Sequence, residues 1–147
     1  MQFSTSIEYA IHGLVYLARA GTAGPAMVSE IAEATQIPQS YLRKVLQLLA
    51  RGGLVASHRG ARGGFSLARD PRGITLQHVV EAIDGGLPSY SCVKEKRRCM
   101  DVPCPVSAAF EAARRKMGEA LSRTTIGSLA SSVSKRTDDW LAVTART

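Results

Sequence analysis

Three cysteines are the residues of this chain with the most obvious chemistry, and they are spaced as Cys92-x6-Cys99-x4-Cys104. Thiolates bind soft metals and iron–sulfur clusters. The first gap is wider than the gaps usual in structural zinc sites, and neither gap is the two-residue gap of ferredoxins. The spacing alone therefore selects neither zinc nor a cluster, and three thiolates leave a fourth ligand position unfilled.

The surroundings of these cysteines favour a metal or redox role over a disulfide framework. Basic residues lie between them, namely Lys94, Lys96, Arg97 and Arg98. Positive neighbours favour the thiolate form of cysteine, whereas an odd, small cysteine count is unlike a secreted disulfide scaffold. Since no secretory signal and no apolar run of ~18 residues is visible, we expect a cytoplasmic protein without a membrane partner.

A glycine-rich loop with two arginines is the second candidate site. The run His58-Arg59-Gly60-Ala61-Arg62-Gly63-Gly64 separates two short strand-like segments, residues 54–57 and 65–68. This pattern predicts a β-hairpin with Arg59 and Arg62 at its tip. Arginines presented in this way can enter a narrow minor groove of DNA. The formal net charge of +7 also makes nucleic acid the first partner to test.

Two short helices are expected before this hairpin. The first spans residues 29–35, with Ser29 as its N-cap, and the second runs from Gln39 to Arg51 after a break at Pro38. Two such helices are typical of a helix-turn-helix, whose second helix meets the base edges with its N-terminal residues. The predicted DNA contacts on this helix are Gln39, Ser40, Tyr41, Arg43 and Lys44. Arg43 is suited to guanine, whereas Ser40, Tyr41 and Lys44 are suited to phosphates.

The remaining elements are also helical. Residues 5–20 carry a helical apolar stripe, and Thr5 with Glu8 matches a capping box at its start. A further helix is expected to begin after Thr75 as its N-cap, and a long helix is expected to begin at Pro105. The long helix has one apolar face, which predicts dimerisation. Its residues are Val106, Phe110, Ala113, Met117, Ala120 and Leu121.

The predicted fold is therefore mostly α with a small β-wing, a winged helix-turn-helix followed by a long C-terminal dimerisation helix. We divide the chain into four parts. They are a DNA-binding domain (residues 1–84), a cysteine loop for cluster binding (85–104), a dimerisation helix with a short terminal element (105–130) and a weakly structured tail (131–147).

The combination of motifs resembles a known family. The motifs are Ile37-Pro38-Gln39-Ser40-Tyr41-Leu42, Arg59-Gly60-Ala61-Arg62-Gly63-Gly64-Phe65, the three cysteines, and Thr124-Thr125-Ile126-Gly127-Ser128-Leu129. Over roughly residues 1–130 the chain resembles winged-helix regulators of the IscR/NsrR/RirA type. The resemblance implies a homodimeric transcriptional regulator, a repressor, that binds a palindromic DNA operator. It also implies a 2Fe–2S or 4Fe–4S cluster on Cys92, Cys99 and Cys104, which senses nitric oxide, redox state, or iron and cluster supply.

The fourth cluster ligand is not evident from the resemblance. No histidine follows Cys104, unlike in members that place a histidine or cysteine close by. Some members recruit a carboxylate or imidazole from the first helix of the partner subunit, which makes Glu8 and His12 the candidates. The alternative is that Glu8 belongs to the capping box with Thr5 and that His12 pairs with Glu8 on the surface.

Parts of the sequence are also compatible with three other function classes. A winged-helix regulator could use zinc or thiol oxidation in place of a cluster. An enzyme with a cysteine nucleophile is not expected, because no phosphate loop or metal-hydrolase motif occurs and only three histidines are available, so we expect no small-molecule substrate. A basic RNA-binding protein is disfavoured because 5% aromatic residues provide little stacking surface.

Overall fold

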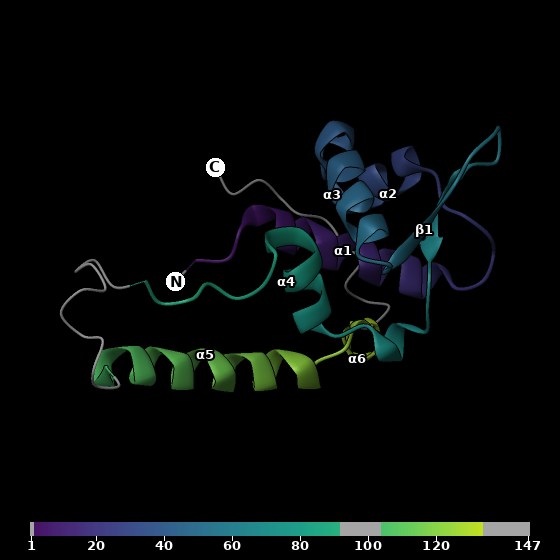
Figure 1. Ribbon diagram of the computed structural model, residues 1–147. Coiled ribbons are helices and arrows are strands. Elements are labelled where there is room, and N and C mark those ends of the chain that lie inside the picture. Colours follow the sequence, from purple (N-terminus) through teal and green to yellow (C-terminus); the bar gives the residue numbers. More distant parts are fainter. Residues whose placement is uncertain (1, 92–103, 134–147) are drawn as a thin grey trace.

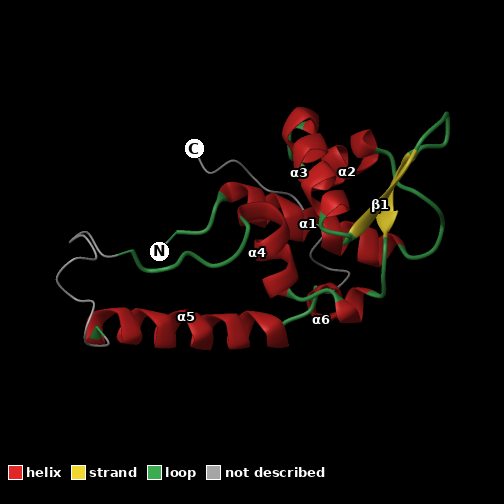
Figure 2. Cartoon of the chain, in the orientation of Figure 1, coloured by secondary structure: helices red, strands yellow, loops and turns green. Residues whose placement is uncertain are grey.

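The computed structural model describes residues 2–91 and 104–133, and it confirms a mostly helical chain with one small hairpin (Figures 1 and 2). The elements are α1 (Thr5–Ala20), α2 (Val28–Thr35), α3 (Gln39–Arg51), β1 (Val55–His58), β2 (Gly64–Leu67), a 3-10 turn at Pro71–Gly73, α4 (Leu76–Asp84), α5 (Pro105–Arg123) and α6 (Ile126–Ser132). Among these helices, none is both long and apolar enough to span a membrane.

One apolar core is built around α1, which packs against α2, α3, α4 and α6. The apolar residues of α3 recur every three or four positions, so they share one side of the helix and are buried together. These residues are Leu42, Val45, Leu46 and Leu49. Because each fully buried leucine stabilises the fold by about 1.5–3 kcal/mol, this side of α3 is held firmly and its other sides face outward.

The hairpin formed by β1 and β2 is tied to the helical body by a third segment. The two strands are antiparallel, with Val55 opposite Leu67. Ala26, just before α2, forms a bridge with Phe65 in which each backbone N–H donates to the other residue's carbonyl at 2.9 Å. Gly64 lies beside this bridge at φ 154°, and a Cβ there would lie only 2.1 Å from the Ala26 carbonyl oxygen. Glycine is therefore required for the close approach.

Two predicted helix caps are wrong and one is confirmed. The first helix is preceded by Ser4, so Thr5 is its first residue, and the Ser4 hydroxyl donates to Asp84 at 2.9 Å. Glu8 consequently does not sit in a capping box with Thr5. Ser29 lies inside α2, because pairing of the preceding residues with β2 keeps the chain extended up to Met27, whose N–H donates to Glu30 at 2.7 Å.

Thr75 caps α4 as predicted. Its Oγ1 accepts from the His78 backbone N–H at 3.2 Å, while its own backbone N–H donates to His78 Nδ1 at 3.2 Å. His78 therefore has a structural role at the start of α4.

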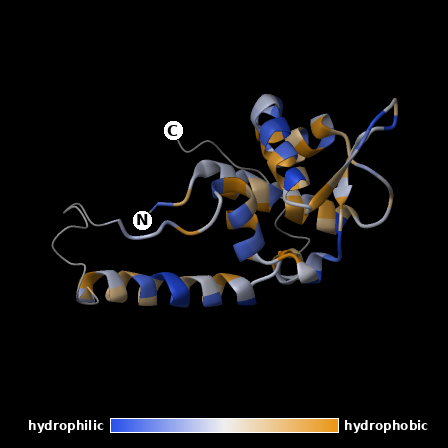
Figure 3. Cartoon of the chain, viewed as in Figure 1, coloured by the Kyte–Doolittle hydropathy of each residue, from blue (hydrophilic) through white to orange (hydrophobic). Residues whose placement is uncertain are grey.

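The long helix α5 is an arm attached at its C-terminal end. It lies along one side of the molecule, where it packs on α4, and none of its residues is fully buried (Figure 1). After α5 the chain is joined to the segment before α4: Leu76 donates to the Thr124 carbonyl at 2.9 Å, and Ile126 donates to the Ile74 carbonyl at 2.8 Å. The next helix, α6, packs on α1 and buries Ile126 completely. Figure 3 shows hydrophilic and hydrophobic bands alternating along α5.

Candidate nucleic-acid interface

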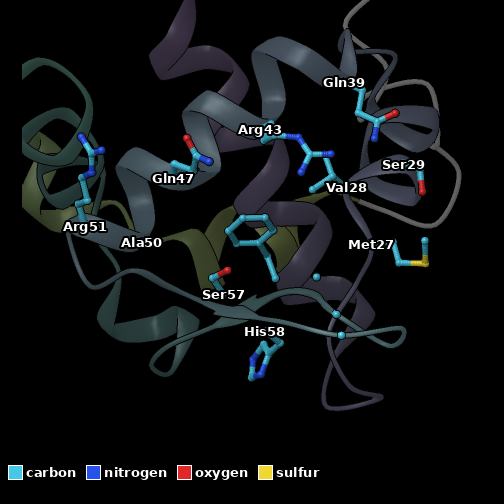
Figure 4. Close-up of a pocket in the computed structure, with 14 residues that line it drawn as sticks. Met27, Val28, Ser29, Gln39, Arg43, Gln47, Ala50, Arg51, Ser57 and His58 are labelled. Carbon is cyan, nitrogen blue, oxygen red and sulfur yellow. The ribbon is translucent and has the colours of Figure 1, made fainter.

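A groove of about 530 Å³ lies between α3, the start of α2 and the hairpin (Figure 4). We call it the α3–wing groove. From α3 it is lined by Gln39, Arg43, Gln47, Ala50 and Arg51; from the segment at the start of α2 by Met27, Val28 and Ser29; and from the hairpin by Ser57, His58, Gly60, Gly63, Gly64 and Phe65. A helix and a hairpin that face one another across an open groove form the geometry of a winged helix.

The five predicted contact residues of α3 are all exposed, but they lie on different sides of the helix. Gln39 and Arg43 border the α3–wing groove. Tyr41 lies about 200° around the helix axis from Arg43 and is 59% exposed. The Lys44 ammonium lies 5.9 Å from the centre of the Tyr41 ring. The structure therefore brings Gln39 and Arg43 together with the wing and leaves Tyr41 on the other flank.

The predicted wing arginines are at the hairpin tip. Arg59 and Arg62 are exposed, and within residues 2–91 and 104–133 neither side chain makes a hydrogen bond or an ion pair. The turn is closed by the Gly63 N–H, which donates to the Gly60 carbonyl at 2.9 Å. Gly60 adopts φ 105°, a conformation that side-chain-bearing residues rarely take.

The positive charge of Arg43 in the groove is not compensated by a carboxylate among the described residues, unlike the charges of Arg72 and Arg114. Arg72 lies 2.7 Å from Asp70, and hydrogen bonds from its side chain and backbone hold the pKa of that carboxyl at about 2. Arg114 likewise lies 2.9 Å from Glu111. Arg43, in contrast, has no acidic partner in the part of the chain that the structure describes. Cations without carboxylate partners favour binding of an anionic ligand.

Two polar residues of α3 in the groove were not among the predicted contacts. Gln47 and Arg51 line the groove, and they follow Arg43 at intervals of four residues. This spacing was the available signal, because residues four apart share one side of a helix. His58 has a different role: its ring points away from α3 in Figure 4, and its Nε2 lies 2.8 Å from the Ser66 hydroxyl.

The cysteine site falls largely outside the described residues. Cys92 and Cys99 belong to the range 92–103, which the structure does not describe. Cys104 is half-buried and immediately precedes α5. Within the described residues, no group of three histidine, cysteine or acidic side chains is placed to hold a metal. The predicted ligand triad therefore stays a prediction.

Glu8 and His12 lie together on one side of α1. They line a largely apolar hollow of about 570 Å³, with Leu121 of α5 and Leu129 of α6. Glu8 is exposed and makes no hydrogen bond or ion pair with another described residue, whereas His12 is half-buried. Leu121 is in the last turns of α5 and Cys104 precedes its first turn, so about 25 Å of helix separates Cys104 from this hollow.

Comparison with known proteins places this geometry in a family. The model of the Rrf2 family, described as iron-dependent transcriptional regulators, matches residues 3–132. A protein of Aquifex aeolicus that is named as an HTH-type transcriptional regulator is 34% identical over 132 residues, which cover 88% of this chain and 91% of that protein.

Solved structures agree with the family match. CymR, titled the global cysteine regulator of B. subtilis, superposes with a TM-score of 0.73 at 27% identity and covers 91% of this chain and 99% of CymR. IscR of T. potens superposes with a TM-score of 0.71 at 26% identity, covering 93% and 91% of the two chains. With a winged helix, a basic groove and these matches along nearly its whole length, the chain belongs to the Rrf2 family of transcriptional regulators.

Proposed function

We propose that this chain is a homodimeric repressor that binds a palindromic DNA operator under the control of an iron–sulfur cluster. The observation that carries the proposal is the α3–wing groove, which presents Arg43 without an acidic partner among the described residues. In a helix-turn-helix regulator such a surface faces the duplex. The proposal accounts for the exposure of every residue predicted to contact DNA on α3.

The wing and α3 contact different grooves of the DNA in this proposal. α3 enters the major groove, with Arg43 toward the bases and with Ser40, Tyr41 and Lys44 toward phosphates. Arg59 and Arg62 enter the adjacent minor groove, where negative potential attracts guanidinium groups. Gly60 and Gly63 let the hairpin turn tightly enough to carry both arginines at its tip, whereas Gly64 permits the close approach of the hairpin to Ala26.

Dimerisation is assigned to α5 because its apolar face is uncovered. Val106 is 48% exposed, and Phe110 is 52% exposed even though its ring stacks on Tyr90 at 4.6 Å. Exposed apolar residues that share one helix face favour contact with a second protein surface, and a twofold dimer covers such faces mutually. Two recognition helices about 34 Å apart then match two operator half-sites.

The donor set suits a cluster. Cys92, Cys99 and Cys104 would supply three thiolates, and Cys104 lies immediately before the first turn of α5. Bound there, a cluster supplies a centre that reacts with oxidants and nitric oxide. The description of the matching family as iron-dependent supports this assignment. Because about 25 Å of α5 lies between Cys104 and Leu121, which borders the same hollow as Glu8, we assign helix ligation to Glu8 or His12 of the partner subunit.

Packing connects the cysteine region to the DNA-binding surface. Cys104 leads into α5, α5 packs on α4, and α4 packs on α3. A change in how α5 meets its partner therefore reaches the recognition helix through two helix contacts. Since the spacing of the half-sites is fixed, a small change in dimer geometry weakens operator binding.

A second candidate keeps DNA binding and replaces the cluster by zinc or by thiol oxidation. The specific observation in its favour is the likeness to CymR, which is titled a cysteine regulator. The two candidates predict different contents of the purified protein. A cluster gives iron, acid-labile sulfide and visible absorption, whereas the alternative gives bound zinc or reversible loss of free thiols.

The test is anaerobic purification followed by iron, sulfide and zinc analysis and by light scattering. We expect a dimer with iron and sulfide, and stronger binding of the holo protein than of the apo protein to one duplex. Nitric oxide titration should remove this difference. Equal binding of the two forms would refute the cluster switch, and unchanged spectra in Glu8→Ala and His12→Ala would refute helix ligation.

A further inference from the structure

We propose that Arg43 and Gln47 read two base pairs of each half-site that lie two steps apart, a G·C pair by Arg43 and an A·T pair by Gln47. The inference rests on the proposed function, since it assumes that α3 enters the major groove. It adds a specificity residue, Gln47, and it states which sequence this chain prefers.

Both side chains are free to meet a base edge. Arg43 and Gln47 are exposed, border the α3–wing groove and project from the same side of α3 (Figure 4). Neither makes a hydrogen bond or an ion pair with another residue in the described part of the chain. Their donors and acceptors are thus available to a ligand without loss of an internal partner.

The helix beneath them is rigidly held, which gives the two side chains a defined position. Leu42 and Leu46, each next to one of the pair in sequence, are 0% exposed. The backbone under Arg43 and Gln47 is therefore fixed by the core.

The spacing of the two residues matches the rise of DNA. Four residues of α-helix advance about 6 Å and rotate about 40°, so Arg43 and Gln47 stay on one flank of α3. Two base-pair steps of B-DNA advance about 6.8 Å. With α3 lying along the major groove, the two side chains meet base pairs two steps apart.

The chemistry of each side chain selects its base pair. The guanidinium of Arg43 can donate two hydrogen bonds to guanine O6 and N7, and the amide of Gln47 can bond to adenine N6 and N7 with one donor and one acceptor. A mismatched pair leaves these groups unpaired in the interface. Each good bidentate pair is worth a factor of roughly 5 to 150 in affinity.

The experiment is selection from a library of randomised duplexes with the full-length, anaerobically purified chain. We compare wild type, Arg43→Ala and Gln47→Ala. The control is Arg115→Ala, which removes one positive charge as Arg43→Ala does. Arg115 is exposed on α5, opposite the apolar face of that helix. We expect Arg43→Ala to lose one G·C preference per half-site and Gln47→Ala to lose one A·T preference two positions away. The control should select the wild-type motif.

Affinity measurements on single duplexes complete the test. Replacing either preferred pair should weaken wild-type binding roughly 5- to 150-fold and leave the matching variant unchanged. If either variant selects the wild-type motif, or if the two lost positions are not two steps apart, the inference is wrong and the proposed function stands. If wild type enriches no duplex, the proposed function itself fails.

Discussion

Replacing Gly64 by alanine is expected to detach the wing from the body of the molecule. A Cβ at this position would lie 2.1 Å from the Ala26 carbonyl oxygen and 3.0 Å from the Met27 nitrogen. Both neighbours are backbone atoms, so neither can move aside as a flexible side chain would. The bridge between Ala26 and Phe65, with its two hydrogen bonds of 2.9 Å, must therefore open.

The cost of Gly64→Ala follows from two contributions. Each lost backbone hydrogen bond contributes about 1 kcal/mol to stability, so the bridge accounts for about 2 kcal/mol. Gly64 adopts φ 154°, and holding alanine in such a conformation costs about 1–2 kcal/mol. The free energy of unfolding should fall by about 3–4 kcal/mol, which is a large part of the stability of a small domain.

The assay is urea unfolding followed by circular dichroism, with Gly60→Ala as the matched control. Gly60 adopts φ 105° in the same hairpin, but nothing lies within 4 Å of the position of its Cβ. The control should lose only about 1–2 kcal/mol. We also expect Gly64→Ala to bind a selected duplex more weakly than Gly60→Ala. Equal losses of stability in the two variants would refute the argument that the close approach to Ala26 requires glycine.

Three further predictions follow from other parts of the molecule. Ile126→Ala should lower the free energy of unfolding, measured in urea, by about 2–5 kcal/mol, because Ile126 is 0% exposed where α6 meets α1. A loss below about 1 kcal/mol would contradict this packing. Arg59→Ala should weaken duplex binding and reduce the slope of log affinity against log salt by about 1; unchanged affinity across the salt titration would contradict the minor-groove position of Arg59. Asp70, whose pKa is held at about 2 by Arg72 instead of 3.8, stabilises the fold above about pH 4 and loses this contribution as the pH falls toward 2. The Tm difference between wild type and Asp70→Asn should accordingly narrow across that range, and a constant difference would show that the charge is not involved.

Local features of the chain were largely predictable from its sequence. The expected helices over residues 5–20 and 39–51 coincide with α1 and α3. The cap at Thr75 is also as expected. These features depend on side-chain periodicity and on hydrogen bonds between residues three or four apart, which a sequence displays directly.

The cap errors show where this local reasoning stops. Thr5 and Ser29 are both good capping residues by type, yet each lies inside its helix. The position at which a helix begins depended on distant partners: Ser4 bonds to Asp84, and the pairing of Ala26 with Phe65 holds the chain extended before α2.

For the candidate site, the sequence by itself determined which residues carry charge and donor atoms, including the wing arginines, the polar side of α3 and the three cysteines. Only the tertiary structure decided that Arg43 and Gln47 share a groove with the wing while Tyr41 faces away. It also decided that α5 separates Cys104 from Glu8 and His12. The physical reason is that residue types and short-range periodicity are local, whereas the surfaces that face one another depend on how α1, α3 and α6 bury their apolar sides together.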